Sequence, residues 1–145
     1  MSNALKVLLL IESSREFGRG LLTGIANYAR FHSPWTVYTY PPFFRGTQDT
    51  RRLLNRMRKS GIDGIVAREM DEIDDIINMG VPAIFASTIE PQKGLPKHAF
   101  PIITTDNRQI SDVAADHLLD RGFTHFAYCG YDDVPWSQLR GQYFH

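Results

Sequence analysis

Short apolar runs alternate with longer segments whose apolar residues recur at helical spacing along most of the chain. The first run, Lys6 to Ile11, predicts a parallel strand that is buried on both faces, because apolar residues follow one another without a break. From Phe17 to Ala29 the apolar residues recur at helical spacing, and Ser13 or Ser14 is expected to cap that helix. Ser33-Pro34 ends it.

The same alternation continues to the end of the chain. Further strands are predicted at 35–40, 64–67, 82–86, up to 104, and at 126–130, and further helices at 47–59, 71–79 and up to 123, with a last one beginning near 136. In the helix at 47–59, Leu53, Leu54 and Met57 are predicted to face inward, and Gly61 to close it. Strands alternating with helices imply right-handed crossovers, so the predicted fold class is α/β with a doubly wound parallel sheet.

Polar and aromatic residues gather where the predicted strands end. In a doubly wound sheet, ligands bind beyond the carboxyl ends of the strands, near the point where strand order reverses. The strand ends hold hydroxyls, charges, amides and rings, at Glu12 to Glu16, Pro42 to Phe44, Arg68-Glu69, Ser87-Thr88 and Thr104 to Asn107. This mixture suits a small, polar and partly apolar molecule such as a sugar.

Composition limits the partners of the chain. The 145 residues include 43% hydrophobic ones, enough for a real core, and 16 basic residues balance 16 acidic ones. A chain of zero net charge has no long-range field to attract DNA or an anionic membrane. If the protein contacts DNA, we expect another segment to do so.

The single cysteine and the N-terminal run bear on location. Cys129 cannot form an internal disulfide, and its apolar neighbours predict a buried, inert thiol in a strand, so a cytoplasmic protein is expected. The run from Val7 to Ile11 is far too short for a secretory leader or a membrane span.

Motifs for cofactors, metals and catalysis fail on spacing. The glycines at 18, 20 and 24 fall inside a predicted helix, too late for a dinucleotide fingerprint, and indicate close packing of that helix instead. A phosphoacceptor domain would place acids where Ser13-Ser14 and Arg68 stand. The histidines show no metal-ligand spacing, and no serine lies in a nucleophile elbow. We therefore expect no cofactor, no metal and no catalysis.

The segment from Thr104 to Arg140 resembles the lactose/galactose-repressor family. The resemblance lies in Asp106-Asn107 after a strand, a helix that ends His117-Leu118 through Gly122-Phe123, and an apolar run that ends at Gly130. Ser137 and Arg140 resemble the start of the next helix in that family, whose arginine binds the sugar. The preceding element order is similar to the first lobe of the type I periplasmic-binding-protein fold.

Two departures point to one subgroup. Tyr143 stands where the family mostly has a small residue, and the first strand begins at Leu5 with no helix-turn-helix before it. This arrangement resembles the xylose regulators, in which the sensor precedes a DNA-binding domain like that of the arabinose regulator (AraC). The resemblance implies a first lobe at 5–104, a hinge and the start of a truncated second lobe at 105–145, and a DNA-binding domain after residue 145.

The resemblance also implies a binding site between the two lobes. The implied ligand is a sugar effector, with a pentose such as xylose favoured, and the implied partner is a second copy paired through first-lobe helices. The residues expected to face the sugar are Ser13, Ser14, Phe17, Phe43, Phe44, Arg68, Glu69, Ser87, Asp106 and Arg140. Asp106 or Asn107 either contacts the ligand or caps the following helix.

Three functions are compared. The leading one is the sugar-sensing domain of a bacterial transcription regulator, in which ligand-driven closure of two lobes controls DNA binding. The alternative is a solute-binding protein of a sugar transport system, which has the same fold. An α/β enzyme is disfavoured because the sequence offers no catalytic set.

Overall fold

The computed structural model describes residues 4–40, 47–68, 73–87 and 101–145. These residues fall into two compact units. The first runs to Ser87 and also takes in residues 101–103, and the second comprises residues 104–145. Phe43, Phe44 and Glu69, which the resemblance assigns to the sugar site, lie outside the described residues.

Strands and helices alternate in the described part of residues 5–87, as the sequence predicts. The strands are β1 (Leu5–Leu10), β2 (Trp35–Thr39), β3 (Gly64–Ala67), β4 (Ala83–Ser87) and β5 (Ile102–Thr104), and the helices are α1 (Glu16–His32), α2 (Thr47–Lys59), α3 (Ile73–Ile77), α4 (Asn107–Asp120) and α5 (Pro135–Phe144). Gly61 follows α2 with φ of 65°, in the left-handed region where glycine carries no steric penalty.

The strands form a five-stranded sheet in the order β2-β1-β3-β4-β5. β1 pairs in parallel with β2 and with β3, and β3 pairs in parallel with β4. β5 joins through a bond of 3.0 Å from the backbone N–H of Phe85 to the carbonyl of Pro101. This order confirms the predicted doubly wound parallel sheet.

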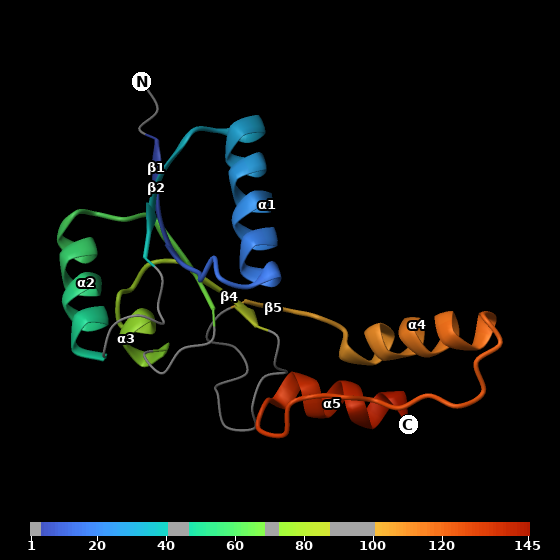
Figure 1. Cartoon of the computed structure of the whole chain (residues 1–145). Coiled ribbons are helices and arrows are strands. Elements are labelled where there is room, and N and C mark those ends of the chain that lie inside the picture. The colour runs from blue at the N-terminus through green and yellow to red at the C-terminus, as the bar shows by residue number, and fades with distance from the viewer. Residues whose placement is uncertain (1–3, 41–46, 69–72, 88–100) are drawn as a thin grey trace. The chain divides into compact units, whose positions relative to one another are not determined.

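Helices cover both faces of the sheet, with α1 on one face and α2 and α3 on the other (Figure 1). Alternate residues of β1 therefore enter two separate cores. Leu8 and Leu10 pack with the α2 and α3 side, whereas Val7, Leu9 and Ile11 pack with α1. The continuous apolar run of β1 thus reflects its central position, as predicted. The inward residues Leu53, Leu54 and Met57 of α2 are buried.

The start of α1 differs from the prediction. Arg15, and neither Ser13 nor Ser14, occupies the N-cap position, and it makes no side-chain capping bond. The backbone carbonyls of both serines instead accept bonds from the Arg19 Nη1, at 3.3 and 2.9 Å. That guanidinium also pairs with Glu16 at 2.6 Å. The Arg19 guanidinium thus holds the loop before α1, but as a donor it cannot cap the N–H groups of the first turn.

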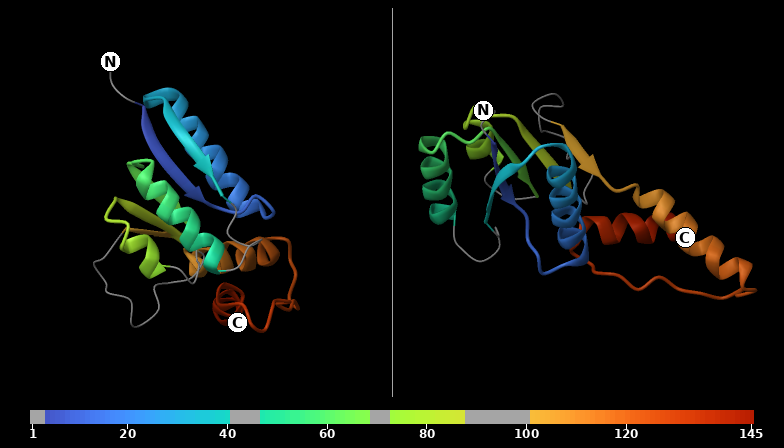
Figure 2. Two further views of the ribbon diagram at one scale, coloured as in Figure 1. Left: turned by 90° about the vertical axis from the view of Figure 1, so that its left-hand side faces the viewer. Right: turned by 90° about the horizontal axis from the view of Figure 1, so that it is seen from above.

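The second unit is built from α4 and α5, which lie side by side (Figure 2). Aromatic rings line their connection, with the Phe144 ring centroid 5.4 Å from that of Phe126 and 5.9 Å from that of Tyr128. The predicted strand at 126–130 is wrong, because this segment has no strand conformation. A strand exists only through pairing, and no neighbouring strand runs alongside this segment in the described part of the unit.

The same segment overturns the prediction for Cys129. Its thiol is exposed, not buried, although Phe126 and Tyr128 of the same segment pack against Phe144 of α5. Apolar neighbours in sequence predicted a core position, but burial requires a surface to pack against.

Candidate functional site

The strand order places the reversal point between β1 and β3. The chain leaves β1 for β2 on one side and returns to β3 on the other, so the loops that follow β1 and β3 lie next to each other. The backbone N–H of Arg68 donates to the carbonyl of Leu10 at 3.0 Å, which aligns the two strand ends. Glu12, Phe17 and Arg68 are brought together at this point.

A buried ion pair joins these strand ends. The Arg68 Nη1 lies 2.6 Å from the Glu12 Oε1, and the two side chains are 7% and 3% exposed. Burial of both partners means that each charge depends on the other, because an unpaired charge in the interior is strongly unfavourable. The ion pair therefore holds the Arg68 side chain in one position within the first unit.

Phe17 covers this ion pair. Its ring centroid lies 4.8 Å from the Arg68 guanidinium carbon, a cation–π distance, and the side chain is half-buried. Part of the ring therefore remains available at the carboxyl end of β1. Since an aromatic ring stacks on the apolar face of a sugar, the exposed part of Phe17 is a candidate contact.

Two features near Phe17 were not predicted from the sequence. Glu12 was grouped with the strand-end residues, but its pairing with Arg68 was not anticipated. The second feature is Gly18, where an added Cβ would lie 1.9 Å from the Glu12 carbonyl oxygen. The glycine was attributed to close helix packing, and the structure shows that the close neighbour is the end of β1.

One oxygen of Glu12 stands out within this cluster. Oε2 is buried and has no hydrogen-bond partner among the described residues, although Oε1 is bound to Arg68. Buried carboxylate oxygens are usually bonded to protein or water. In the described part of the first unit, one carboxylate oxygen of Glu12 is therefore left without a hydrogen bond.

The remaining candidates of the first unit are less constrained. Ser13 and Ser14 are exposed. Ser87 ends β4, and its side chain lies outside what the structure describes. Within the first unit, the structure thus brings Phe17 to Arg68 and places the two serines in the loop that joins β1 to α1.

Asp106 and Arg140 belong to the second unit. Asp106 is the N-cap of α4, and its carboxylate accepts from the Gln109 backbone N–H at 2.9 Å. Of the two roles expected for Asp106 or Asn107, helix capping is therefore observed for Asp106.

Replacing Asp106 with alanine is expected to lower the free energy of unfolding by about 1 kcal/mol, because an N–H in the first turn of α4 loses its acceptor. Asp106→Asn is the matched control and should stay within about 0.5 kcal/mol of the wild type, since asparagine caps helices as well as aspartate does. Urea unfolding followed by circular dichroism measures both. An equal loss in the two variants would show that the negative charge, and not the cap, matters.

Arg140 joins α5 to α4. Its Nε donates to the Asn107 Oδ1 at 3.0 Å, and its guanidinium carbon lies 4.7 Å from the Trp136 ring centroid. The Ser111 hydroxyl bonds the Arg140 carbonyl at 3.0 Å. These contacts hold the half-buried Arg140 guanidinium in one orientation. The bond to Asn107 uses its Nε and neither of its Nη atoms.

The start of α5 is also held in place. The Ser137 hydroxyl accepts from the Tyr131 backbone N–H at 2.7 Å, and the Tyr128 hydroxyl donates to the Ser137 carbonyl at 2.8 Å. Ser137 is 1% exposed. It therefore supports the helix that carries Arg140 and does not itself offer a surface to a ligand.

Neither a metal cluster nor a membrane helix is found within the described ranges. No group of three or more His, Cys, Asp or Glu side chains there is arranged to hold a metal ion. None of the helices described is long and apolar enough to cross a membrane.

Comparisons with known proteins identify one similar sequence and several similar folds. No protein-family profile matches the chain. The xylose operon regulatory protein of Haemophilus influenzae is 27% identical over 128 residues, covering 86% of this chain and 31% of that protein. The chain therefore spans about a third of this curated relative.

Two solved structures share the fold. A periplasmic binding protein/LacI transcriptional regulator from Alkaliphilus metalliredigens, complexed with D-xylulofuranose, is 17% identical with a TM-score of 0.67, covering 97% of this chain and 50% of that one. The substrate-binding protein of a sugar ABC transport system from Bordetella parapertussis is 20% identical with a TM-score of 0.70, covering 99% of this chain and 47% of that one. The chain thus has the fold seen in half of a LacI-type or periplasmic sugar-binding protein, and its sequence is similar to that of a xylose operon regulator.

Proposed function

We propose that the chain is part of the sugar-sensing domain of a bacterial transcription regulator. The observation that carries this proposal is the 27% identity to a xylose operon regulatory protein across 86% of the chain. Residues 5–104 are the first lobe, and residues 105–145 are the hinge and the start of the second. Sugar binds between the lobes, and closure changes the competence of the regulator to bind DNA.

The proposed ligand is a pentose, with xylose favoured. The relative's name refers to xylose, and one similar structure contains a pentulose. Each unit offers a suitable group. Phe17 presents part of an aromatic ring, and Arg140 presents a guanidinium that can donate to sugar hydroxyls. Ser13, Ser14, Arg68 and Ser87, with Asp106, complete the described part of the proposed site.

Assembly and location follow from the same proposal. The regulator acts in the cytoplasm, and its DNA contacts are made by an AraC-type domain beyond residue 145, consistent with the zero net charge of this chain. A homodimer forms through first-lobe helices. On α1, Tyr28 and Phe31 are 52% and 75% exposed, which supports a protein contact there.

Transport is the second candidate function, favoured by the similarity to the substrate-binding protein from B. parapertussis. The sequence that follows His145 in the parent protein separates the two. A second lobe followed by a helix-turn-helix supports the regulator, and a second lobe alone supports transport. We propose no reaction, since the similar proteins are regulators and sugar-binding proteins.

Isothermal titration of the full-length parent protein tests the proposal. D-Xylose is expected to release heat and to raise the melting temperature, whereas unrelated hexoses and polyols bind more weakly. A panel of pentoses, hexoses and polyols that gives neither heat nor a melting shift would contradict a sugar-sensing function.

Phe17→Ala in the full-length protein is expected to weaken xylose binding about tenfold, because the sugar loses an aromatic stacking partner. Phe123→Ala is the control, since it removes an exposed aromatic residue outside both the proposed sugar site and the proposed dimer helices, and it should leave the dissociation constant unchanged. Titration calorimetry gives both constants, and a melting curve of each variant verifies that it is folded. Equal weakening in both variants would argue against a contact at Phe17.

A further inference from the structure

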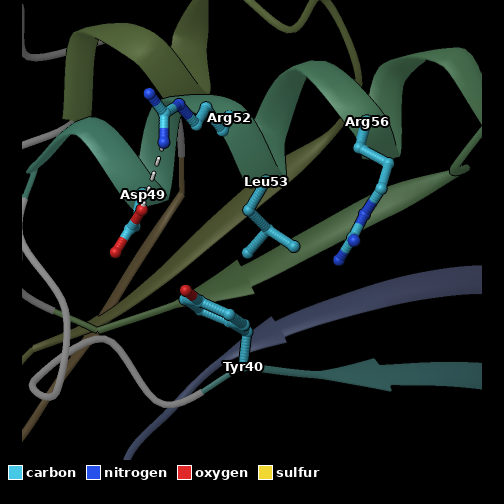
Figure 3. Close-up of a pocket in the computed structure, with 5 residues that line it drawn as sticks. All are labelled: Tyr40, Asp49, Arg52, Leu53 and Arg56. Carbon is cyan, nitrogen blue, oxygen red and sulfur yellow. Dashed lines mark ion pairs between the residues drawn. The ribbon is translucent and has the colours of Figure 1, made fainter.

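A cavity lies beside α2, which covers the face of the sheet opposite α1. It has a volume of about 270 Å³ and lies between the carboxyl end of β2 and α2. The residues that line it are Tyr40, Asp49, Arg52, Leu53 and Arg56. Figure 3 shows Tyr40 and Leu53 facing each other, with Asp49 and Arg52 to one side and Arg56 to the other.

The arginines of α2 divide into two groups. Arg51 pairs with Asp75 at 2.7 Å, and an Arg58 Nη2 donates to the Asn78 carbonyl, so both hold α2 to the α3 segment. Arg52 and Arg56 face the cavity instead. Contacts with the α3 segment therefore explain the positions of Arg51 and Arg58, but not those of Arg52 and Arg56.

The two cavity arginines are poorly neutralised. Arg52 lies 3.9 Å from Asp49, and with side chains 78% and 45% exposed such a pair contributes little. For Arg56, no ion pair is found among the residues that the structure describes. Arg52 and Arg56 are four residues apart on one helix, a spacing at which like charges repel. A bound anion would remove that repulsion.

We propose that this cavity binds the phosphate group of a small molecule. The guanidiniums of Arg52 and Arg56 bind the phosphate, since planar donors match its oxygens. The Asp49 carboxylate repels the phosphate and accepts hydrogen bonds from hydroxyl groups of the same molecule. Leu53 and the Tyr40 ring form the apolar side of the cavity. The cavity is just below the usual size of ligand sites, so the molecule is small.

Among the described residues, the cavity and the proposed sugar site use different side chains. Leu53 and Tyr40 belong to the core on the α2 side of the sheet. Phe17 belongs to α1, which covers the opposite face. The two sites therefore share no described side chain, and variants can separate them.

The test uses the full-length protein at constant ionic strength, because screening alters exposed charges. Inorganic phosphate, glycerol 3-phosphate and glycerol are compared by titration calorimetry and melting shift. Both phosphate ligands are expected to bind and glycerol is not. Tighter binding of glycerol 3-phosphate assigns the site to a phosphorylated polyol, and equal binding assigns it to free phosphate.

Arg52→Gln and Arg56→Gln are each expected to weaken phosphate binding at least about tenfold, because each removes charge-assisted hydrogen bonds. Arg51→Gln is the matched control, since it removes the same charge from the same helix but outside the cavity. Phe17→Ala should keep phosphate binding. Absence of binding in the wild type, or equal weakening by Arg51→Gln, would overturn the proposal.

Discussion

Replacing Arg68 with methionine is expected to lower the free energy of unfolding by about 3–5 kcal/mol. The change leaves the Glu12 carboxylate, which is 3% exposed, without the cation that neutralises it. The Phe17 ring also loses the guanidinium 4.8 Å from its centroid. Urea unfolding followed by circular dichroism and by fluorescence measures the loss.

The double variant Glu12→Met with Arg68→Met is the decisive control. Apolar residues of similar volume often replace a buried ion pair without loss, so the double variant is expected to recover most of the stability. Its coupling energy, obtained from a double-mutant cycle with both single variants, should exceed about 2 kcal/mol. Additive effects of the two single changes would mean that the two charges do not depend on each other.

Replacing Gly18 with alanine is expected to cost about 3 kcal/mol, near the upper end of the range for overpacking. The new Cβ would lie 1.9 Å from the Glu12 carbonyl oxygen, a backbone atom that cannot rotate away. Relief of this clash requires α1 to move from the end of β1. Thermal and urea unfolding of the variant both report the cost.

Gly24→Ala is the matched control in the same helix. An added Cβ there meets nothing within 4 Å, so the variant should gain about 0.5–1 kcal/mol from the better helix propensity of alanine. Equal stability of the Gly18→Ala variant and the wild type would mean that the first turn of α1 lies farther from β1 than the structure places it.

The strands and helices of the first unit could be predicted because each is indicated by the spacing of apolar residues within its own segment. The unbroken apolar run of β1 indicated a strand buried on both faces, and its alternate residues do enter two cores. The same reasoning failed at 126–130, where an equally apolar segment lacks a neighbouring strand in the described part of the second unit. An apolar pattern shows that a segment can form a strand, but whether it does so depends on a neighbouring strand with which it can pair.

The candidate site was predicted in outline but not in detail. Glu12 and Arg68, from two predicted strand ends, do lie together, because parallel strands bring their carboxyl ends to one edge. The pairing of Glu12 with Arg68 depends on which strands are adjacent, and no spacing between residues 12 and 68 encodes that. Arg68, which is expected to face the sugar, pairs with Glu12 and contacts the Phe17 ring.

The buried pair has a practical consequence for redesigning ligand preference. Glu12, Gly18 and Arg68 form an internal support, since a change at any one of them alone is expected to destabilise the fold. Ser13 and Ser14 are exposed in the neighbouring loop between β1 and α1. A library that randomises the two serines and leaves the support untouched should yield mostly folded proteins. One that includes the support should yield mostly insoluble chains, so the two collections would differ first in expression yield and only afterwards in specificity.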